Sequence, residues 1–570
     1  METIEQGKGP KKAFKNGKKQ LITCMKNEKG ENISDREEIL HVCKRFYEDL
    51  YSSSTTPECI ATQENTDTET IPDIIEEEVE NALKGMKKEK APGPDGITSD
   101  LLKIGGTPVI EILTKIFNKI LETRTIPKSW KEAKMILIFK KGDTKEIKNY
   151  RPISLLSHTY KLFSRLIQNR IEKALEENQP REQAGFRKGF STTDHIHALS
   201  QIIEKSNEYN TPLNVGFIDY EKAFDSIEHF AIFEALRKTG INETYVKIIE
   251  DIYTDATAVI EIDELTSRPF EIRRGVRQGD PISPKLFTSA MEQIFRKSNI
   301  EQHGIKVDGE VLHDLRFEDD VALFARTTTD LTSQLNEIDK EGKKVGMKIH
   351  KGKTKYMSNE ETTNKVTIDN EEIERVNSYK YLGQTFYMKE TTKYAIEERI
   401  RQGWGSFGKY KTILENKDIP VNLKKKVFDQ CVLPTLTYGC QTWNITRENI
   451  TKLRTAQRAM ERKILGIKLR DRIRSTEIRR RTKIIDIIKF VTNSKAKWAG
   501  HVARIKDNRW TQRTTDWIPR EGTRSRGRQP RRWRDDLKEH YGNIWPQKAR
   551  DRSEWKRLTE GYIQQWMDIA

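Results

Sequence analysis

Cysteine is scarce in this chain, which has only five among its 570 residues. None of the five forms a C-x-x-C pair and none lies near His501, so neither a zinc knuckle nor a disulfide framework is indicated. Long apolar runs are missing as well: no stretch approaches the roughly 20 apolar residues that span a bilayer, and the N-terminus lacks the apolar core of a signal peptide. We therefore expect an intracellular protein of the nucleus or cytoplasm, in a reducing compartment and without a membrane segment.

Acidic residues are fewer than basic ones, 86 against 103, which gives a formal net charge of +17. This excess attracts polyanions, but ordinary basic proteins share it, so it favours a nucleic-acid partner without identifying one. The length predicts roughly three to four folding units, which is the size of an enzyme. The sequence carries no mark of an oligomeric state.

Residues 1–72 form a polar N-terminal segment that lacks helical periodicity except in EEILHVCKRFYEDLY and ends in a Thr- and Glu-rich linker. We expect the ordered protein to begin after this linker, where Asp73 and Glu76 make a capping box ahead of a helix. Helical patterns then surround short buried strands such as LNVGFID and LRFEDDVALF. The mixture favours the α+β class.

The last hundred residues combine basic side chains with tryptophans. Over residues 494–534, thirteen Lys or Arg stand against three acids. Cations for phosphates beside aromatic faces for stacking are typical of a single-strand-binding surface, which the basic density favours. The alternative is a small tryptophan-anchored helical domain with a solvated exterior. The candidate residues are Trp498, Arg504, Trp510, Arg528, Arg531, Arg532 and Trp533.

Three aspartates adjoin the buried strands. Asp219 closes the strand in VGFIDYEKAFDSI, and Asp319 and Asp320 lie where a hairpin would turn in LRFEDDVALFA. Each feature alone is more often a turn or a helix cap. Side by side in one sheet, the three carboxylates would suit two Mg²⁺ ions, with Mn²⁺ as a substitute, because these hard cations prefer carboxylate, water and phosphate oxygens. Such metal pairs catalyse nucleotidyl transfer.

The order of these segments resembles that of the reverse transcriptases of LINE-type (non-LTR) retrotransposons over roughly residues 75–390. The resemblance is carried by KAPGPDGI (Lys90–Ile97), LIFKKGD, NYRPISLLS (Asn149–Ser157), QAGFRKGFSTTDHI (Gln183–Ile196), FIDYEKAFDSI, GVRQGDPISPKLF (Gly275–Phe287), the hairpin with Asp319 and Asp320, GMKIHKGKTKY and YKYLG (Tyr379–Gly383).

The resemblance implies a right-hand polymerase. Its fingers would occupy residues 73–212, its palm with an antiparallel sheet residues 213–385, and its helical thumb residues 386–465. A basic, Trp-rich, mainly helical region for nucleic-acid binding would follow over residues 466–570. The implied activity is that of an RNA-directed DNA polymerase, which extends a DNA primer or target DNA along an RNA template with dNTPs.

Roles for single residues follow from the same resemblance. It implies that Asp219, Asp319 and Asp320 bind the two metal ions and that Lys353 is the general acid toward pyrophosphate. The implied nucleotide contacts are Lys140, Arg151, Gln278, Gly279 and Phe224, the last as a steric gate against the ribose 2′-hydroxyl. The implied primer grip contains Tyr381, Leu382 and Gly383. Asp225, six positions after the strand end, is expected to cap the next helix.

Glu318 departs from the family pattern, which has a small residue before the two aspartates. A third carboxylate could compete for Mg²⁺ or raise the pKa values of its neighbours, or it could pair with Arg316 on the same strand face. The alternative is therefore a catalytically impaired, retrotransposon-derived nucleic-acid-binding protein; a group II intron maturase is a weaker one. The roughly 75 residues ahead of the motifs are too few for the endonuclease that such elements commonly carry.

Overall fold

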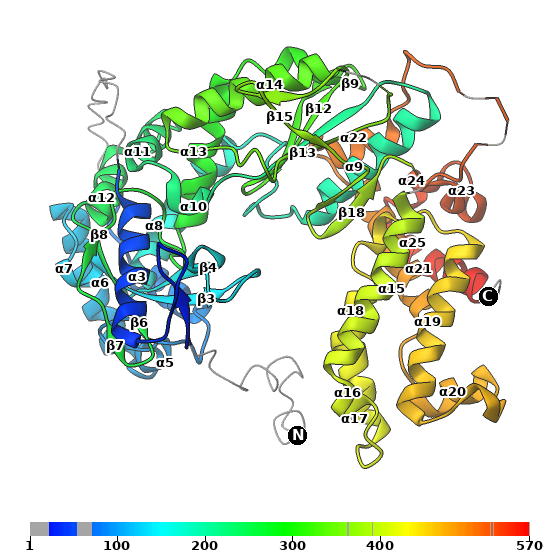
Figure 1. Cartoon of the computed structure of the whole chain (residues 1–570), viewed down its shortest axis with the longest axis horizontal. Coiled ribbons are helices and arrows are strands. Elements are labelled where there is room, and N and C mark those ends of the chain that lie inside the picture. The colour runs from blue at the N-terminus through cyan, green and yellow to red at the C-terminus, as the bar shows by residue number, and fades with distance from the viewer. Residues whose placement is uncertain are drawn as a thin grey trace.

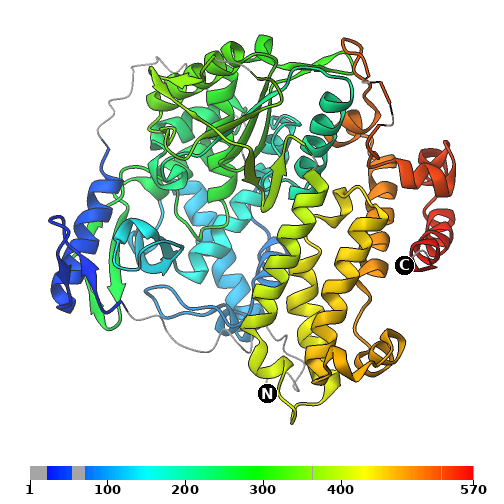
Figure 2. The same cartoon turned by 45° about the vertical axis from the view of Figure 1, so that its right-hand side comes forward.

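The computed structural model describes residues 22–53, 71–361, 364–389, 391–524, 526–527 and 529–568. They form an arch with an N-terminal block on one side, a central sheet at the top and a column of helices on the other side (Figures 1 and 2). Sheets and helices are mixed without a repeating strand–helix order, so the predicted α+β class is confirmed. None of the helices in this described part is long and apolar enough to cross a membrane.

The central sheet contains the candidate site at one end of its strands. The strand order is β11 (Asp314–Phe317), β12 (Asp320–Ala325), β5 (Asn214–Ile218), β13 (Lys355–Ser358) and β16 (Glu374–Arg375), with all neighbours antiparallel except β13 and β16. Alternate side chains enter two different cores: Leu323 packs with helix α14 (Thr328–Lys344), and Phe324 packs with α9 (Thr192–Glu208). Because both faces are buried, β5 and β12 are almost wholly apolar, and their polar residues Asn214 and Asp320 lie at the strand ends.

The N-terminal block is built on a second sheet and surrounding helices. The strands are β4 (Tyr150–Leu155), β3 (Glu132–Phe139), β6 (Thr257–Ile262) and β7 (Leu265–Thr266) in this order, with β8 (Phe270–Glu271) on β6. The helices are α4 (Glu76–Gly85), α5 (Ser99–Ile104), α6 (Gly106–Thr123), α7 (Lys128–Lys131), α8 (His158–Glu177), α10 (Ala223–Ser226), α11 (His229–Lys238), α12 (Glu243–Tyr253) and α13 (Ser283–Lys297). The helix expected after Asp73 begins at Glu76, with Glu78 accepting from the backbone N–H of Ile75.

Residues 22–53 belong to the folded protein, so the prediction that order begins after residue 72 is wrong for them. Strands β1 (Met25–Lys26) and β2 (Asn32–Ile33) precede helix α3 (Arg36–Tyr51), which packs against β6, β7 and β8. The buried residues of α3 recur every four positions, at Ile39, Cys43, Tyr47 and Tyr51. Residues 1–21 and 54–70 of the predicted N-terminal segment lie outside the described residues.

The helical column runs from α15 to the C-terminal end of the described chain. Its helices are α15 (Thr391–Lys409), α16 (Lys411–Leu414), α17 (Val421–Val427), α18 (Leu433–Leu436), α19 (Arg447–Leu465), α20 (Ser475–Thr482), α21 (Ile487–Ala503), α23 (Asp535–Tyr541), α24 (Trp545–Lys548) and α25 (Arg552–Asp568). One apolar core extends from Ile396 to Trp566, so the boundary expected between residues 465 and 466 does not separate two packing units. Helix α22 (Trp510–Asp516) leaves this column and packs against α9.

Candidate active site

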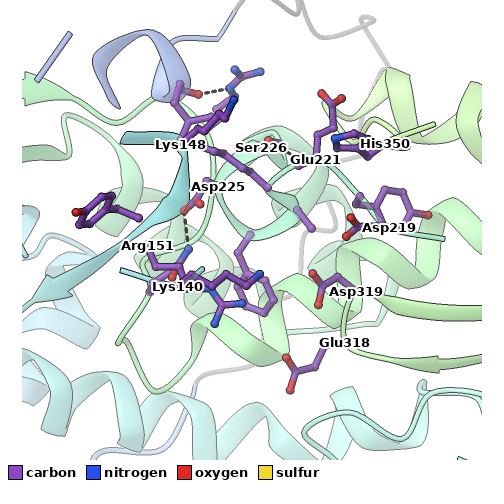
Figure 3. Close-up of a pocket in the computed structure, with 18 of the residues that line it drawn as sticks. Lys140, Lys148, Arg151, Asp219, Glu221, Asp225, Ser226, Glu318, Asp319 and His350 are labelled. Carbon is purple, nitrogen blue, oxygen red and sulfur yellow. Dashed lines mark hydrogen bonds between the residues drawn. The ribbon is translucent and has the colours of Figure 1, made fainter. Parts of the chain in front are cut away.

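The register of the central sheet brings two of the three aspartates opposite each other. In the antiparallel pair of β5 and β12, Ile218 faces Val321, so Asp219 and Asp320 are the next pair at the end of the ladder. Glu318 and Asp319 form the two-residue turn of the β11–β12 hairpin. Asp219 and Asp319 consequently line the same cavity (Figure 3).

The hairpin turn is braced by the loop that precedes α9. Glu318 has a φ of 61°, in the left-handed region that two-residue hairpins use. The Gln183 side-chain oxygen accepts from the backbone N–H of Gly185 at 2.8 Å and of Glu318 at 3.2 Å. A Cβ at Gly185 would lie 2.5 Å from the Glu318 nitrogen, so only glycine permits this approach. The segment QAGF thereby fixes the position of the turn.

Asp219 is held by the loop that connects α14 to β13. Its backbone N–H donates to the Thr354 hydroxyl at 3.2 Å, and its carbonyl accepts from the His350 N–H at 2.7 Å. The Lys353 Nζ lies 3.4 Å from Asp219 Oδ2, and 57% of the lysine side chain remains exposed. The lysine that the sequence singled out therefore lies beside the first aspartate with its charge accessible from the cavity.

Negative charge is crowded at this end of the sheet. Burial and the neighbouring Asp319 and Asp219 raise the pKa of Asp320 to about 6, while Lys140 and Arg151 act in the opposite direction. Burial, followed by Asp219, also raises the pKa of Asp319. A divalent cation would relieve this repulsion. Within the described ranges no three His, Cys, Asp or Glu side chains form a ready-made metal cluster, so water and phosphate oxygens would have to complete the coordination shell.

A cavity of about 930 Å³ joins these carboxylates to a set of cations. Lys140 follows β3, and Arg151 lies on β4 opposite Ile138, so the second sheet presents both side chains to the cavity (Figure 3). Burial and the nearby Arg151 lower the pKa of Lys140, whereas Asp319 and Asp219 raise it. The cavity therefore has an acidic wall and a basic wall, each from a different sheet.

The remaining expected nucleotide contacts line the same cavity. The Phe224 ring stacks on Phe287 with centroids 4.2 Å apart, which fixes its orientation. Gly279 has a φ of +119°, and a Cβ there would lie 2.9 Å from the Ser154 carbonyl oxygen, so glycine is required. Gln278 donates from Nε2 to Asp225 Oδ1 at 2.8 Å.

Asp225 and Tyr51 are site residues whose role the sequence did not indicate. Asp225 does not cap a helix as expected: it is 5% exposed and accepts from the Tyr51 hydroxyl at 2.8 Å as well as from Gln278. The four-residue apolar spacing in EEILHVCKRFYEDLY was the available signal for a buried helix. It contained nothing that pointed to the cavity.

The expected primer grip is a hairpin between β17 (Ser378–Tyr381) and β18 (Gln384–Tyr387). Leu382 and Gly383 form its turn with positive φ values of 47° and 80°. Tyr381 is only 2% exposed, and its hydroxyl donates to the Leu315 carbonyl at 3.0 Å. The predicted contact of the Tyr381 side chain with nucleic acid is therefore not supported, because the ring is a core residue of the sheet.

The tryptophans of the basic C-terminal region are core residues too. Trp498, Trp510 and Trp533 are 9%, 1% and 1% exposed, so the prediction that they stack on bases is wrong. Their indoles pack inside the protein instead. The Trp510 Nε1 donates to Glu182, and the Trp533 Nε1 donates to the Gln441 carbonyl.

Several of the arginines that were expected to contact phosphates are engaged within the chain. Arg504 donates to the Ala549 carbonyl, Arg531 pairs with Glu539, and Arg532 pairs with Glu208. Arg528 lies outside the described residues. The alternative interpretation, a tryptophan-anchored helical region with a charged exterior, therefore fits the described part of this region.

Comparisons with known proteins agree with the motif order. Residues 138–386 match the family model described as reverse transcriptase (RNA-dependent DNA polymerase). A putative uncharacterized transposon-derived protein of Caenorhabditis elegans is 34% identical over 272 residues, which are 44% of this chain and 96% of that protein. The probable RNA-directed DNA polymerase from transposon BS of Drosophila melanogaster is 27% identical over 403 residues, 67% of this chain and 44% of that protein.

A Pol polyprotein from the type-1 retrotransposable element R2 of Nasonia vitripennis is 29% identical over 314 residues, 52% of this chain and 30% of that protein. The chain thus spans less than half the length of these two polymerase relatives. Among solved structures, an apo telomerase from Candida tropicalis is 12% identical over 51% of this chain and 66% of that chain, with a TM-score of 0.33. From the family match and the relatives, the chain belongs to the reverse transcriptase family, as the polymerase region of the non-LTR retrotransposon type.

Proposed function

We propose that this chain is an RNA-directed DNA polymerase that adds dNTPs to a DNA 3′-hydroxyl on an RNA template. The single observation that carries the proposal is the register of β5 and β12, which sets Asp219 opposite Asp320, while Asp219 and Asp319 line a cavity that cations also line. Carboxylates on one wall and cations on the other suit a triphosphate held through metal ions. The name of the transposon BS relative, a probable RNA-directed DNA polymerase, supports the same activity.

Asp219, Asp319 and Asp320 would hold two Mg²⁺ ions, or Mn²⁺ in their place. The donor set fits, because the site offers hard oxygen ligands, and burial together with neighbouring carboxylates raises the pKa values of Asp319 and Asp320. When bound, such ions activate the attacking hydroxyl and neutralise the charge on the triphosphate. The three carboxylates would hold the metal ions at the end of the central sheet.

The basic wall would bind the phosphates of the incoming nucleotide. The Arg151 guanidinium can contact two phosphate oxygens at once, and Lys140 adds a point charge beside it. Lys353, 3.4 Å from Asp219, would donate a proton to the leaving pyrophosphate. Phe224 would exclude the ribose 2′-hydroxyl, and Gln278 with Gly279 would contact the nucleotide from the same side of the cavity.

The division into parts is also a proposal. Residues 73–212 with the second sheet would act as fingers, residues 213–385 as palm and residues 386–465 as thumb, with RNA template and DNA primer between them. In place of a separate tail, the helices after residue 465 would support the thumb, with which they share a core.

Primer extension on an RNA template tests the proposal. Wild-type protein should extend the DNA primer in the presence of Mg²⁺ and dNTPs, and Asp219→Ala should not, because one metal ligand is lost. Equal background incorporation by both proteins would reject the polymerase activity.

A further inference from the structure

Helix α3 ends at the wall of the candidate active site although it lies outside the matched residues 138–386. Its residue Leu50 lines the cavity. The next residue, Tyr51, is 3% exposed and lies between two aromatic rings, with centroid distances of 6.5 Å to Phe270 and 6.3 Å to Tyr47. The Tyr51 ring is therefore held within an aromatic cluster.

One buried carboxylate oxygen joins the helix to the cavity. The Tyr51 hydroxyl donates to Asp225 Oδ1 at 2.8 Å, and the Gln278 amide donates from Nε2 to the same oxygen at 2.8 Å. Asp225 is 5% exposed, so water cannot readily replace either donor. Because a buried carboxylate is costly without hydrogen bonds, both donors are held to it.

The backbone around this contact is fixed on both sides. The Tyr51 and Leu50 carbonyls accept from the Arg273 N–H at 3.0 Å and from the Arg274 Nε at 2.8 Å. The Val276 N–H donates to the Phe224 carbonyl at 2.8 Å. The end of α3, the segment with Phe224 and Asp225, and the segment with Gln278 therefore form one rigid unit.

The hydrogen bond to Asp225 determines how Gln278 presents itself to a ligand. An amide has two N–H donors and one carbonyl acceptor. With one donor anchored on Asp225, the rotation of the amide is restricted, and the second N–H and the carbonyl remain for the cavity. Loss of the Tyr51 hydroxyl would leave Asp225 short of a donor, and the carboxylate and the amide could then turn.

We propose that Tyr51 is a positioning residue for nucleotide binding, which acts through Asp225 to fix the amide of Gln278 at the cavity wall. The inference rests on the proposed polymerase function. It gives helix α3, which the family match does not include, a part in substrate binding.

The substitution Tyr51→Phe tests the proposal, since it removes the hydroxyl and keeps the ring. We expect the KM for dNTP to rise about three- to tenfold, with kcat changed less than about twofold, because the lost interaction serves binding. Tyr562→Phe is the matched control: it also removes a buried tyrosine hydroxyl that donates to a buried aspartate, Asp536, but in the helical column. It should leave the KM unchanged.

A double-mutant cycle with Gln278→Ala separates positioning from general destabilisation. If Tyr51 acts through Gln278, Tyr51→Phe should have little further effect on KM in the Gln278→Ala background. An unchanged KM in Tyr51→Phe, or the same increase in both backgrounds, would overturn the proposal.

A second readout does not depend on activity. Tyr51→Phe should accelerate hydrogen exchange of backbone amides over residues 274–280, and Tyr562→Phe should not. If wild type shows no more extension than Asp219→Ala, the proposed function fails, and exchange alone decides about the positioning contact. Equal exchange in wild type and Tyr51→Phe would then overturn it.

Discussion

At the scale of single residues, Glu318 is the side chain that distinguishes this site from the family pattern. Burial and the adjacent Asp319 and Asp320 raise the pKa of Glu318 to about 7. Its side chain points away from Asp219 and Asp319 in the cavity (Figure 3). The alternative in which Glu318 pairs with Arg316 is wrong, because that guanidinium is buried and forms ion pairs with Glu292 and Asp314, both at 2.8 Å.

In this orientation the Glu318 carboxylate would not coordinate the metal ions. We predict that Glu318→Gln changes the Mg²⁺ concentration for half-maximal primer extension by less than about threefold, because the Glu318 carboxylate points away from Asp219 and Asp319 and would not coordinate the ions. Titration of Mg²⁺ in the extension assay measures it. An increase in activity of tenfold or more would instead mean that the carboxylate competes for metal and impairs the enzyme.

The residues of the site differ in how far the sequence could reveal them. Asp219, Asp319 and Asp320 stand in short motifs whose order was visible, and the strand register then follows from the apolar pattern. Asp225 depends on Tyr51, which is 174 positions away. No local pattern reports such a contact, so the sequence alone predicts a helix cap at Asp225.

At the scale of elements, the packing of α22 against α9 depends on buried polar groups. The His197 imidazole bonds to the Thr515 hydroxyl at 2.8 Å and lies 4.5 Å from the Trp533 ring. Lys205, on the same helix, donates to the Thr514, Thr515 and Trp517 carbonyls at the end of α22. Burial, and then the charges of Lys205 and Lys495, lower the pKa of His197 to about 3.

This histidine should make stability depend on pH. Because the folded state binds the proton more weakly than the unfolded chain, stability falls as the pH drops below the ordinary value of about 6.5, by about 1.4 kcal/mol per pH unit. We predict that His197→Asn reduces the loss of unfolding free energy between pH 6.5 and 5 by about 2 kcal/mol. Urea titrations at both pH values measure it. An identical loss in wild type and His197→Asn would contradict the account; substitution of the exposed His41 is the control.

The tryptophans show why the sequence predicts a binding surface in the C-terminal helices where the structure has a core. Interleaved arginines and tryptophans are typical of a nucleic-acid surface, but the same spacing arises when one side of each helix packs and the other is charged. Only the tertiary partners decide. In this chain Glu182 and the Gln441 carbonyl accept the Trp510 and Trp533 indole N–H groups.

At the scale of the whole molecule, C-terminal segments pack into cores that earlier parts of the chain form. Trp510 and Trp517 enter the core between α9 and the central sheet, while later residues return to the core of the helical column. The changes in composition along the chain predict successive blocks. Packing does not follow those changes, since distant segments complete one another's cores.

This packing predicts that the C-terminal region cannot be removed as a separate binding module. A chain that ends at residue 493 would lose several buried tryptophans. The loss of one lowers the free energy of unfolding by about 3 to 5 kcal/mol, whereas the whole free energy of unfolding of a domain is about 5 to 15 kcal/mol. Thermal unfolding and limited proteolysis should find it unfolded or aggregated. Full-length protein with the exposed Lys506 and Arg520 changed to Gln should stay folded. A truncated chain with the wild-type unfolding temperature would contradict this.

The central claim is that Asp219, Asp319 and Asp320 form the metal site of an RNA-directed DNA polymerase. Its most direct test is the rate of dTTP incorporation on an oligo(dT)–poly(rA) primer–template with Mg²⁺, for wild type, Asp219→Asn and the exposed control Asp418→Asn. The account predicts that Asp219→Asn lowers the rate about a hundredfold or more, since a metal ion contributes several kcal/mol to the transition state, and that Asp418→Asn does not change it. Equal rates for all three proteins would contradict it.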